Sequence, residues 1–308
     1  MKAHNYFFVV LLFSCFTACI SVYQSTEIST QKSFIPAGKN MNVCKELLGK
    51  VVIYSIFVDT KQALPWTEFN ITSTQDSIAR AADWLMAEAK KRKIDLDIQL
   101  AYHENKNVMP IAMNLPKSSL CHVMSTPRSK SGKHIIDSWS NKIAKQAGMS
   151  LPKDTSRVIK TKNVISERER LVAKLRDIYK TDNVVILYFV NNYFKEELSV
   201  SLYTNTSLFT EFSIISFKNP AVIAHEVLHL FGATDLYPIA VKSRKGYSYA
   251  YDYETLNKDF PNEIMYVQHK QINKLMISPI TEYLVGWSKS LDNCYSRLLY
   301  SNYKPLEY

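Results

Sequence analysis

Short runs of β-branched and aromatic residues recur along the chain, and they predict a sheet of five strands. Two runs are apolar at nearly every position, VVIYSIFVD (51–59) and NVVILYFVNN (183–192), which predicts strands buried on both faces. A third run, ELSVSLYTN (197–205), alternates polar and apolar residues and predicts an edge strand. The other two strands are expected at residues 94–102 and 210–217.

Apolar residues at helical spacing predict helices between these strands. Residues 73–93 carry an apolar stripe, with Ser73 as the N-cap and lysines crowded at the C-terminal end. Together with the strands on either side, this helix suggests a right-handed parallel crossover. Residues 166–180 begin with Ser166 and Glu169 at the spacing of a capping box. Further helices are expected at residues 134–146, 220–231 and 278–287.

The first residues have the layout of a secretory signal peptide, which we place at residues 1–18. Their apolar run, YFFVVLLF, is too short to span a bilayer as a mature helix. The polar, Ser/Thr-rich residues 19–43 are interpreted as a flexible tether. The sequence Phe-Thr-Ala-Cys before the tether resembles a bacterial lipobox, which implies that Cys19 is lipidated and anchors the chain to a membrane. Cleavage without lipidation is the alternative, so we expect an exported protein, either a cell-envelope lipoprotein or a secreted one.

The folded part is expected at residues 44–308. Its composition is that of an ordinary globular protein, with 46% hydrophobic and 21% charged residues. We divide it into an upper part, 44–232, and a smaller lower part, 233–308. Residues 103–164 are interpreted as an insertion in the upper part, with little regular structure beyond one helix.

The net charge of +10 comes from basic residues that are dispersed along the chain. This dispersal favours a solvated surface, and attraction to acidic surfaces or substrates is the alternative. Nucleic acid is not expected as a partner of an exported protein. Three cysteines remain in the expected folded part, and the three possible disulfide pairs among them stay open: Cys44, Cys121 and Cys294.

The stretch NPAVIAHEVLHLFG has the signals of a short helix. Asn219 is a good N-cap, Pro220 a good first residue, and Gly232 a natural stop. His225 and His229 share one face of that helix because they lie one turn apart. The other positions are apolar, so the helix should be buried, and unpaired polar groups within it would be costly. A metal ion would satisfy them, whereas the alternative is a chance match in a buried helix.

The spacing His225-Glu226-x-x-His229 is the one that zinc hydrolases use. Two imidazoles at this spacing can bind one Zn²⁺, and the glutamate beside them can act as a general base toward water. A catalytic zinc also needs a third protein ligand. Asp235 lies three residues beyond Gly232, at a spacing that a glycine turn serves.

The whole run, HEVLHLFGATD, resembles HExxHxxGxxH/D, the signature of the metzincin metallopeptidases, in the aspartate form of the snapalysins. The resemblance implies that His225, His229 and Asp235 bind one catalytic Zn²⁺, that Glu226 is the general base, and that Gly232 permits the turn. It also implies an α/β (α+β) catalytic domain: a mixed five-stranded sheet with an antiparallel edge strand, an active-site helix and a smaller C-terminal helical subdomain. A substrate would pair with the edge strand, at residues 198–203, through main-chain hydrogen bonds.

Metzincins also carry a methionine turn beneath the metal, and the segment FPNEIMYVQ offers Met265 for this place. The alternative is an ordinary core methionine. Gly-Ala-Thr-Asp resembles the aspzincin motif as well, with the same ligand. The gluzincin pattern would instead take its third ligand from a second helix, where Glu254 and Glu263 are the candidates. Neither Tyr237 nor Tyr266 is assigned a metal role.

These residues predict an exported zinc-dependent endopeptidase that acts on protein or peptide substrates. One alternative is a catalytically silent, metzincin-like surface binding protein. Retention of Glu226 argues against that alternative, because a scaffold does not need a general base. The other alternative is a zinc hydrolase that acts on a non-peptide substrate.

Overall fold

The computed structural model describes residues 44, 46–61, 63–105, 107–115, 130–151, 165–191, 199–204, 210–216, 218–236, 240–243, 246–249, 258–267, 269–292 and 295. The predicted signal peptide, the tether and Cys19 lie outside these residues, as do Cys121 and Cys294. Cys44 is described and is a buried free thiol whose Sγ donates to the carbonyl of Val184. Among the described residues, no helix is long and apolar enough to cross a membrane.

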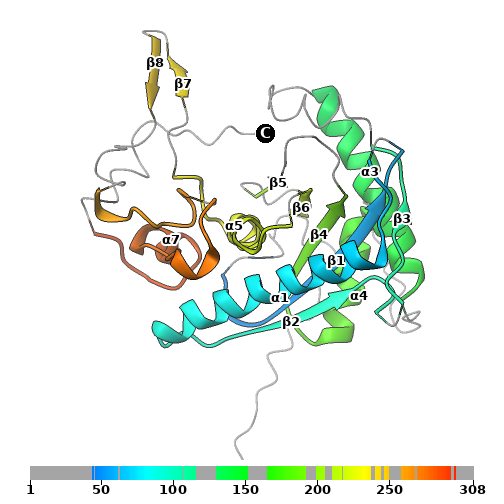
Figure 1. Ribbon diagram of the computed structural model, residues 1–308, viewed down its shortest axis with the longest axis horizontal. Coiled ribbons are helices and arrows are strands. Elements are labelled where there is room, and N and C mark those ends of the chain that lie inside the picture. The colour runs from blue at the N-terminus through cyan, green and yellow to red at the C-terminus, as the bar shows by residue number, and fades with distance from the viewer. Residues whose placement is uncertain are drawn as a thin grey trace, which may run out of the picture. The chain divides into compact units, whose positions relative to one another are not determined.

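A six-stranded mixed sheet forms the centre of the described residues (Figure 1). The strand order is β2-β1-β4-β6-β5, and β3 pairs with β1. The pairs are parallel except for β5, which runs antiparallel to β6 at the edge. The strands are β1 (Gly49–Asp59), β2 (Leu96–Tyr102), β3 (Ile111–Ala112), β4 (Asn183–Val190), β5 (Ser199–Leu202) and β6 (Phe212–Ile215).

All five expected strands are present, and the expected strand count is wrong by one, because β3 adds a sixth strand. Two-residue β3 lies inside the segment that was expected to be largely irregular. It pairs only with Val58 and Asp59 at the end of β1, which extends beyond the register of β2. So short a run carries no periodicity of its own.

Helices cover both faces of the sheet, which explains why β1 and β4 are apolar nearly throughout (Figure 1). On one side α1 packs against α5, and on the other side α3 packs against α4. The helices are α1 (Glu68–Lys91), α3 (Lys130–Met149), α4 (Glu167–Tyr179), α5 (Pro220–Leu230) and α7 (Pro279–Leu284), with a 3₁₀ turn η1 (Ile272–Lys274).

Helix α1 begins five residues earlier than predicted, with Thr67 rather than Ser73 as its N-cap. The Thr67 hydroxyl accepts a hydrogen bond from the Asn70 amide at 3.2 Å, whereas Ser73 donates to the Asn70 carbonyl within the helix. Trp66 fixes this start, because its ring nitrogen donates to the carbonyl of Val58 and its amide donates to Asp59. The helix start is therefore set by docking onto β1, which local capping signals did not reveal.

The region at 103–164 contains more regular structure than expected. Helix α3 spans twenty residues, longer than the expected 134–146, and buries an apolar face that includes Trp139 and Ile143. The ring nitrogen of Trp139 donates to the Met113 carbonyl at 3.4 Å, which links α3 to the chain just after β3. Helix α4 begins with the predicted capping box of Ser166 and Glu169.

The described part after α5 has little regular structure. A separate antiparallel hairpin, β7 (Ala240–Ser243) with β8 (Gly246–Tyr249), was not predicted. The expected last helix is present as α7, which is shorter than predicted and starts after its N-cap Ser278. In the chain between the hairpin and α7, Glu263 and Met276 form an isolated parallel β-bridge. This bridge joins the turn at residues 263–266 to the segment that precedes α7.

Candidate metal centre

Helix α5 forms as its sequence predicts and is buried along nearly its whole length. The side chain of Asn219 accepts a hydrogen bond from the Ala221 amide at 2.8 Å, and Pro220 is the first helical residue. His225 is 2% exposed and Glu226 is 4% exposed. Two polar side chains this deeply buried need partners close at hand.

Gly232 turns the chain after α5 and brings Asp235 back toward the two histidines. Its φ of +96° is a conformation that residues with a Cβ rarely adopt. The returning chain is held where the Leu236 amide donates to the carbonyl of Met265 at 2.8 Å. Asp235 therefore lies beside His225 and His229 although it is not on their helix.

The ligand atoms of these three residues form a nearly equilateral triangle. The Nε2 atoms of His225 and His229 lie 3.0 Å apart. Oδ1 of Asp235 lies 3.1 Å from each of them. Within the described residues, they form the one group of His, Cys, Asp and Glu side chains whose ligand atoms converge in this way.

The other nitrogen of each imidazole faces a backbone carbonyl. Nδ1 of His225 lies 3.1 Å from the carbonyl oxygen of Ile264, and Nδ1 of His229 lies 2.8 Å from that of Ala233. A carbonyl oxygen can only accept, so each Nδ1 carries a hydrogen, and each ring presents a lone pair at Nε2 in its neutral form, the form that binds a metal. Two nitrogen lone pairs and a carboxylate oxygen thus point at a common position, which suits a cation.

This donor set fits a zinc ion. Zn–N and Zn–O bonds of about 2.0–2.2 Å in a tetrahedral site separate neighbouring ligand atoms by about 3.3–3.6 Å. The 3.0–3.1 Å sides of the triangle reach that spacing by a small outward shift of the side chains. Three protein ligands also leave a fourth position for water or substrate, as in catalytic rather than structural zinc sites.

The metal-free group carries opposite charges that hold it together. Burial opposes protonation of His229, but the Asp235 carboxylate outweighs this effect and raises the pKa of His229 to about 9. Burial also disfavours the Asp235 carboxylate, but the two histidines hold its pKa well below the usual range. A divalent cation would replace the proton as the partner of this carboxylate.

Glu226 stands next to this triangle in the chain but is not one of its three members. Its Oε2 accepts a hydrogen bond of 2.6 Å from the hydroxyl of Ser201 on β5. The negative charge of Glu226 also contributes to raising the pKa of His229, after the larger effect of Asp235.

Of the two alternative third ligands, Glu263 is described, and it is not one of the residues that converge on this group. The Glu263 carboxylate accepts hydrogen bonds from the Met265 amide at 3.2 Å, from the Thr281 hydroxyl at 2.8 Å, and from the Ser278 amide. It therefore anchors the 263–266 turn to the start of α7, and burial raises its pKa. Glu254 and Tyr237 lie outside the described residues.

Met265 is fully buried in the turn whose backbone contacts His225. Its carbonyl accepts from Leu236, and the preceding carbonyl, that of Ile264, faces His225. Sequence reasoning identified Met265 in this segment but missed the Ile264 carbonyl, because a backbone acceptor carries no residue-type signal. It also missed Ser201, a serine in an edge strand without any motif.

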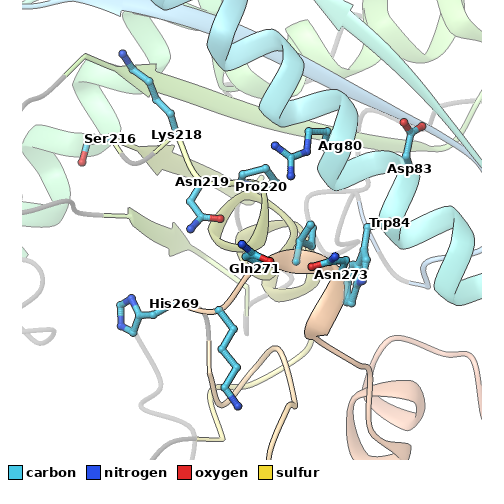
Figure 2. Close-up of a pocket in the computed structure, with 12 residues that line it drawn as sticks. Arg80, Asp83, Trp84, Ser216, Lys218, Asn219, Pro220, His269, Gln271 and Asn273 are labelled. Atoms are coloured by element: carbon cyan, nitrogen blue, oxygen red, sulfur yellow. The ribbon is translucent and has the colours of Figure 1, made fainter.

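A separate open pocket of about 860 Å³ lies at the other end of α5 (Figure 2). Arg80 and Trp84 of α1, His269 and the N-terminal residues Asn219 and Pro220 are among its lining residues. None of the three residues of the metal group lines it. His269 therefore belongs to a different surface from the two histidines of α5.

No protein-family model matches the chain, and no curated protein matches it.

Proposed function

We propose that this chain is an exported zinc-dependent endopeptidase of metzincin type. In this proposal His225, His229 and Asp235 bind one Zn²⁺, and Glu226 is the general base. The observation that carries the proposal is the convergence of the three ligand atoms, which lie 3.0–3.1 Å apart. The Nδ1 atom of each histidine is hydrogen-bonded to a backbone carbonyl, which leaves Nε2 to face the other two ligand atoms.

The chain's own residues supply the parts of a hydrolytic site. When bound, zinc would act as a Lewis acid that polarises the scissile carbonyl and lowers the pKa of water. Glu226 would take a proton from the water that attacks the carbonyl carbon, and would then give it to the leaving amine nitrogen. The low exposure of Glu226 and His225 keeps bulk water from these groups and strengthens the electrostatic interactions among them.

The position of strand β5 at the edge of the sheet favours a peptide over a small molecule as the substrate. It is the last strand in the order of the sheet, and it contributes Ser201 beside Glu226. An extended peptide could add to such an edge through main-chain hydrogen bonds. The scissile bond of that peptide would then pass close to the general base.

The test compares the wild type with Glu226→Gln on a diverse peptide pool, read by mass spectrometry, with the zinc content of both proteins measured. Glu68→Gln, an exposed change at the start of α1, is the control. We expect cuts with the wild type and the control, none with Glu226→Gln, and one zinc per chain in all three. Cleavage that survives Glu226→Gln would refute the mechanism. Zinc-loaded wild type that cuts no peptide would favour the silent binding protein or a non-peptide substrate.

A further inference from the structure

Two serines on neighbouring strands of the sheet form a chain of hydrogen bonds that ends at Glu226. Ser201 of β5 and Ser213 of β6 are directly opposite each other in the antiparallel register, so their side chains leave the same face. Their hydroxyl oxygens are 2.6 Å apart. Ser201 Oγ is also 2.6 Å from Oε2 of Glu226 and 3.2 Å from the Glu226 carbonyl oxygen.

The chemistry of these groups decides the direction of the hydrogen bonds. An ionised carboxylate can only accept, so the single hydroxyl hydrogen of Ser201 is directed to Glu226. Ser213 must then donate to Ser201, because the Ser201 hydrogen is already used. Ser213 is fully buried, so water does not compete for its hydroxyl. The result is a one-way relay from Ser213 to Ser201 to Glu226.

We infer that this relay positions the general base, an inference that rests on the proposed function. A hydrogen bond to an ionised group is about twice as strong as a neutral one, and here it lies in a buried setting. It fixes one carboxylate oxygen toward the sheet and thereby orients the other. Ser213 donates its hydrogen bond to the oxygen of the Ser201 hydroxyl, and this bond keeps the Ser201 hydrogen directed toward the Glu226 carboxylate. Ser201 is thus a positioning residue, and it stands on the edge strand where the substrate is proposed to pair.

The chain offers a control serine on another strand of the sheet. Ser55 lies on β1, which pairs with β2, β3 and β4 and not with β5. Its side chain is fully buried, and its hydroxyl has no hydrogen-bond partner among the described residues. Ser55→Ala therefore removes a buried serine hydroxyl without touching the relay or the strand on which the substrate is proposed to pair.

The first experiment measures kcat, KM and zinc content for Ser201→Ala, Ser201→Thr and Ser55→Ala on a peptide that the wild type cleaves. We expect Ser201→Ala to lower kcat about 10-fold, a part of the 10²–10⁴-fold that a general base contributes. KM and zinc content should stay unchanged. Ser201→Thr keeps the hydroxyl and should retain most of kcat, whereas Ser55→Ala should leave kcat at the wild-type value.

The second experiment does not depend on activity. Urea unfolding of the zinc-loaded wild type, Ser201→Ala, Glu226→Ala and the double variant gives the four free energies of a double-mutant cycle. The relay predicts that the double variant is less destabilised than the sum of the two single variants. Additive losses would overturn the inference, as would a Ser201→Ala enzyme with the kcat of Ser55→Ala while Glu226→Gln is inactive. If no protein cleaves peptide but the cycle is non-additive, the hydrogen-bond relay stands and the peptidase proposal falls.

Discussion

Gly232 turns the chain between α5 and Asp235, and replacing it with alanine should lower the stability of the protein and weaken the proposed metal binding. The residue has φ +96°, outside the left-handed helical region that non-glycine residues tolerate best. An added Cβ would also lie 3.3 Å from the carbonyl oxygen of Leu284, a backbone atom that cannot rotate away. Backbone strain of this kind costs about 1–3 kcal/mol. We expect Gly232→Ala to lower the free energy of unfolding by about 2–3 kcal/mol.

Gly49→Ala is the control variant, because it introduces backbone strain at a position away from the three candidate ligands. Gly49 also has a positive φ, +61°, but an added Cβ there would meet no atom within 4 Å. Gly49→Ala should therefore cost about 1–2 kcal/mol, the usual penalty of the left-handed conformation. Urea unfolding of the metal-free proteins measures both losses.

Metal binding should distinguish the two variants more clearly. In Gly232→Ala, the backbone at residue 232 can relieve its strain only by moving the turn that follows. Asp235 lies three residues further on, so this movement should displace its carboxylate. Loss of a precise ligand position should weaken zinc binding by about 10–100-fold, the range known for disturbed outer-shell partners. Competition with a chromogenic chelator measures this affinity, and Gly49→Ala should retain it. Equal stability and equal zinc affinity in the two variants would refute the role assigned to Gly232.

Three further predictions test other parts of the chain. Asp235→Asn should weaken zinc binding at least about 100-fold in the same competition assay, because even outer-shell partners contribute 10–100-fold; unchanged affinity would remove Asp235 from the ligand set. Burial lowers the pKa of His103 below its ordinary value of 6.5, so the unfolded chain takes up this proton more readily than the folded one. Stability should therefore fall as the pH drops through 6.5, and urea unfolding of His103→Asn at pH 7.5 and 5.5 should show a smaller loss than the wild type; equal losses would contradict this. If Cys19 carries the predicted lipid anchor, Cys19→Ser should shift the protein from the membrane pellet to the soluble fraction in cell fractionation, and an unchanged distribution would argue for cleavage without lipidation.

The sequence by itself determined the elements whose signals are local. The five predicted strands and helix α5 follow from apolar runs and from the cap Asn219, the first residue Pro220 and the stop Gly232. The same helix aligns His225 with His229, because residues four apart share a face whatever surrounds the helix. The resemblance of HEVLHLFGATD to the metzincin signature implied that Asp235 lies beside both histidines, and the structure brings it within 3.1 Å of each.

Only the tertiary structure decided the contacts between distant parts of the chain. The carbonyl of Ile264 beside His225, the Ser201 hydroxyl on Glu226 and the start of α1 at Thr67 have no local signal. Each depends on how strands register and how turns dock, which is set by packing of segments far apart in sequence. Periodicity and capping reveal which residues face inward, but they do not reveal which inward-facing groups meet. The tertiary structure therefore decided the groups that hold the candidate ligands and base in place.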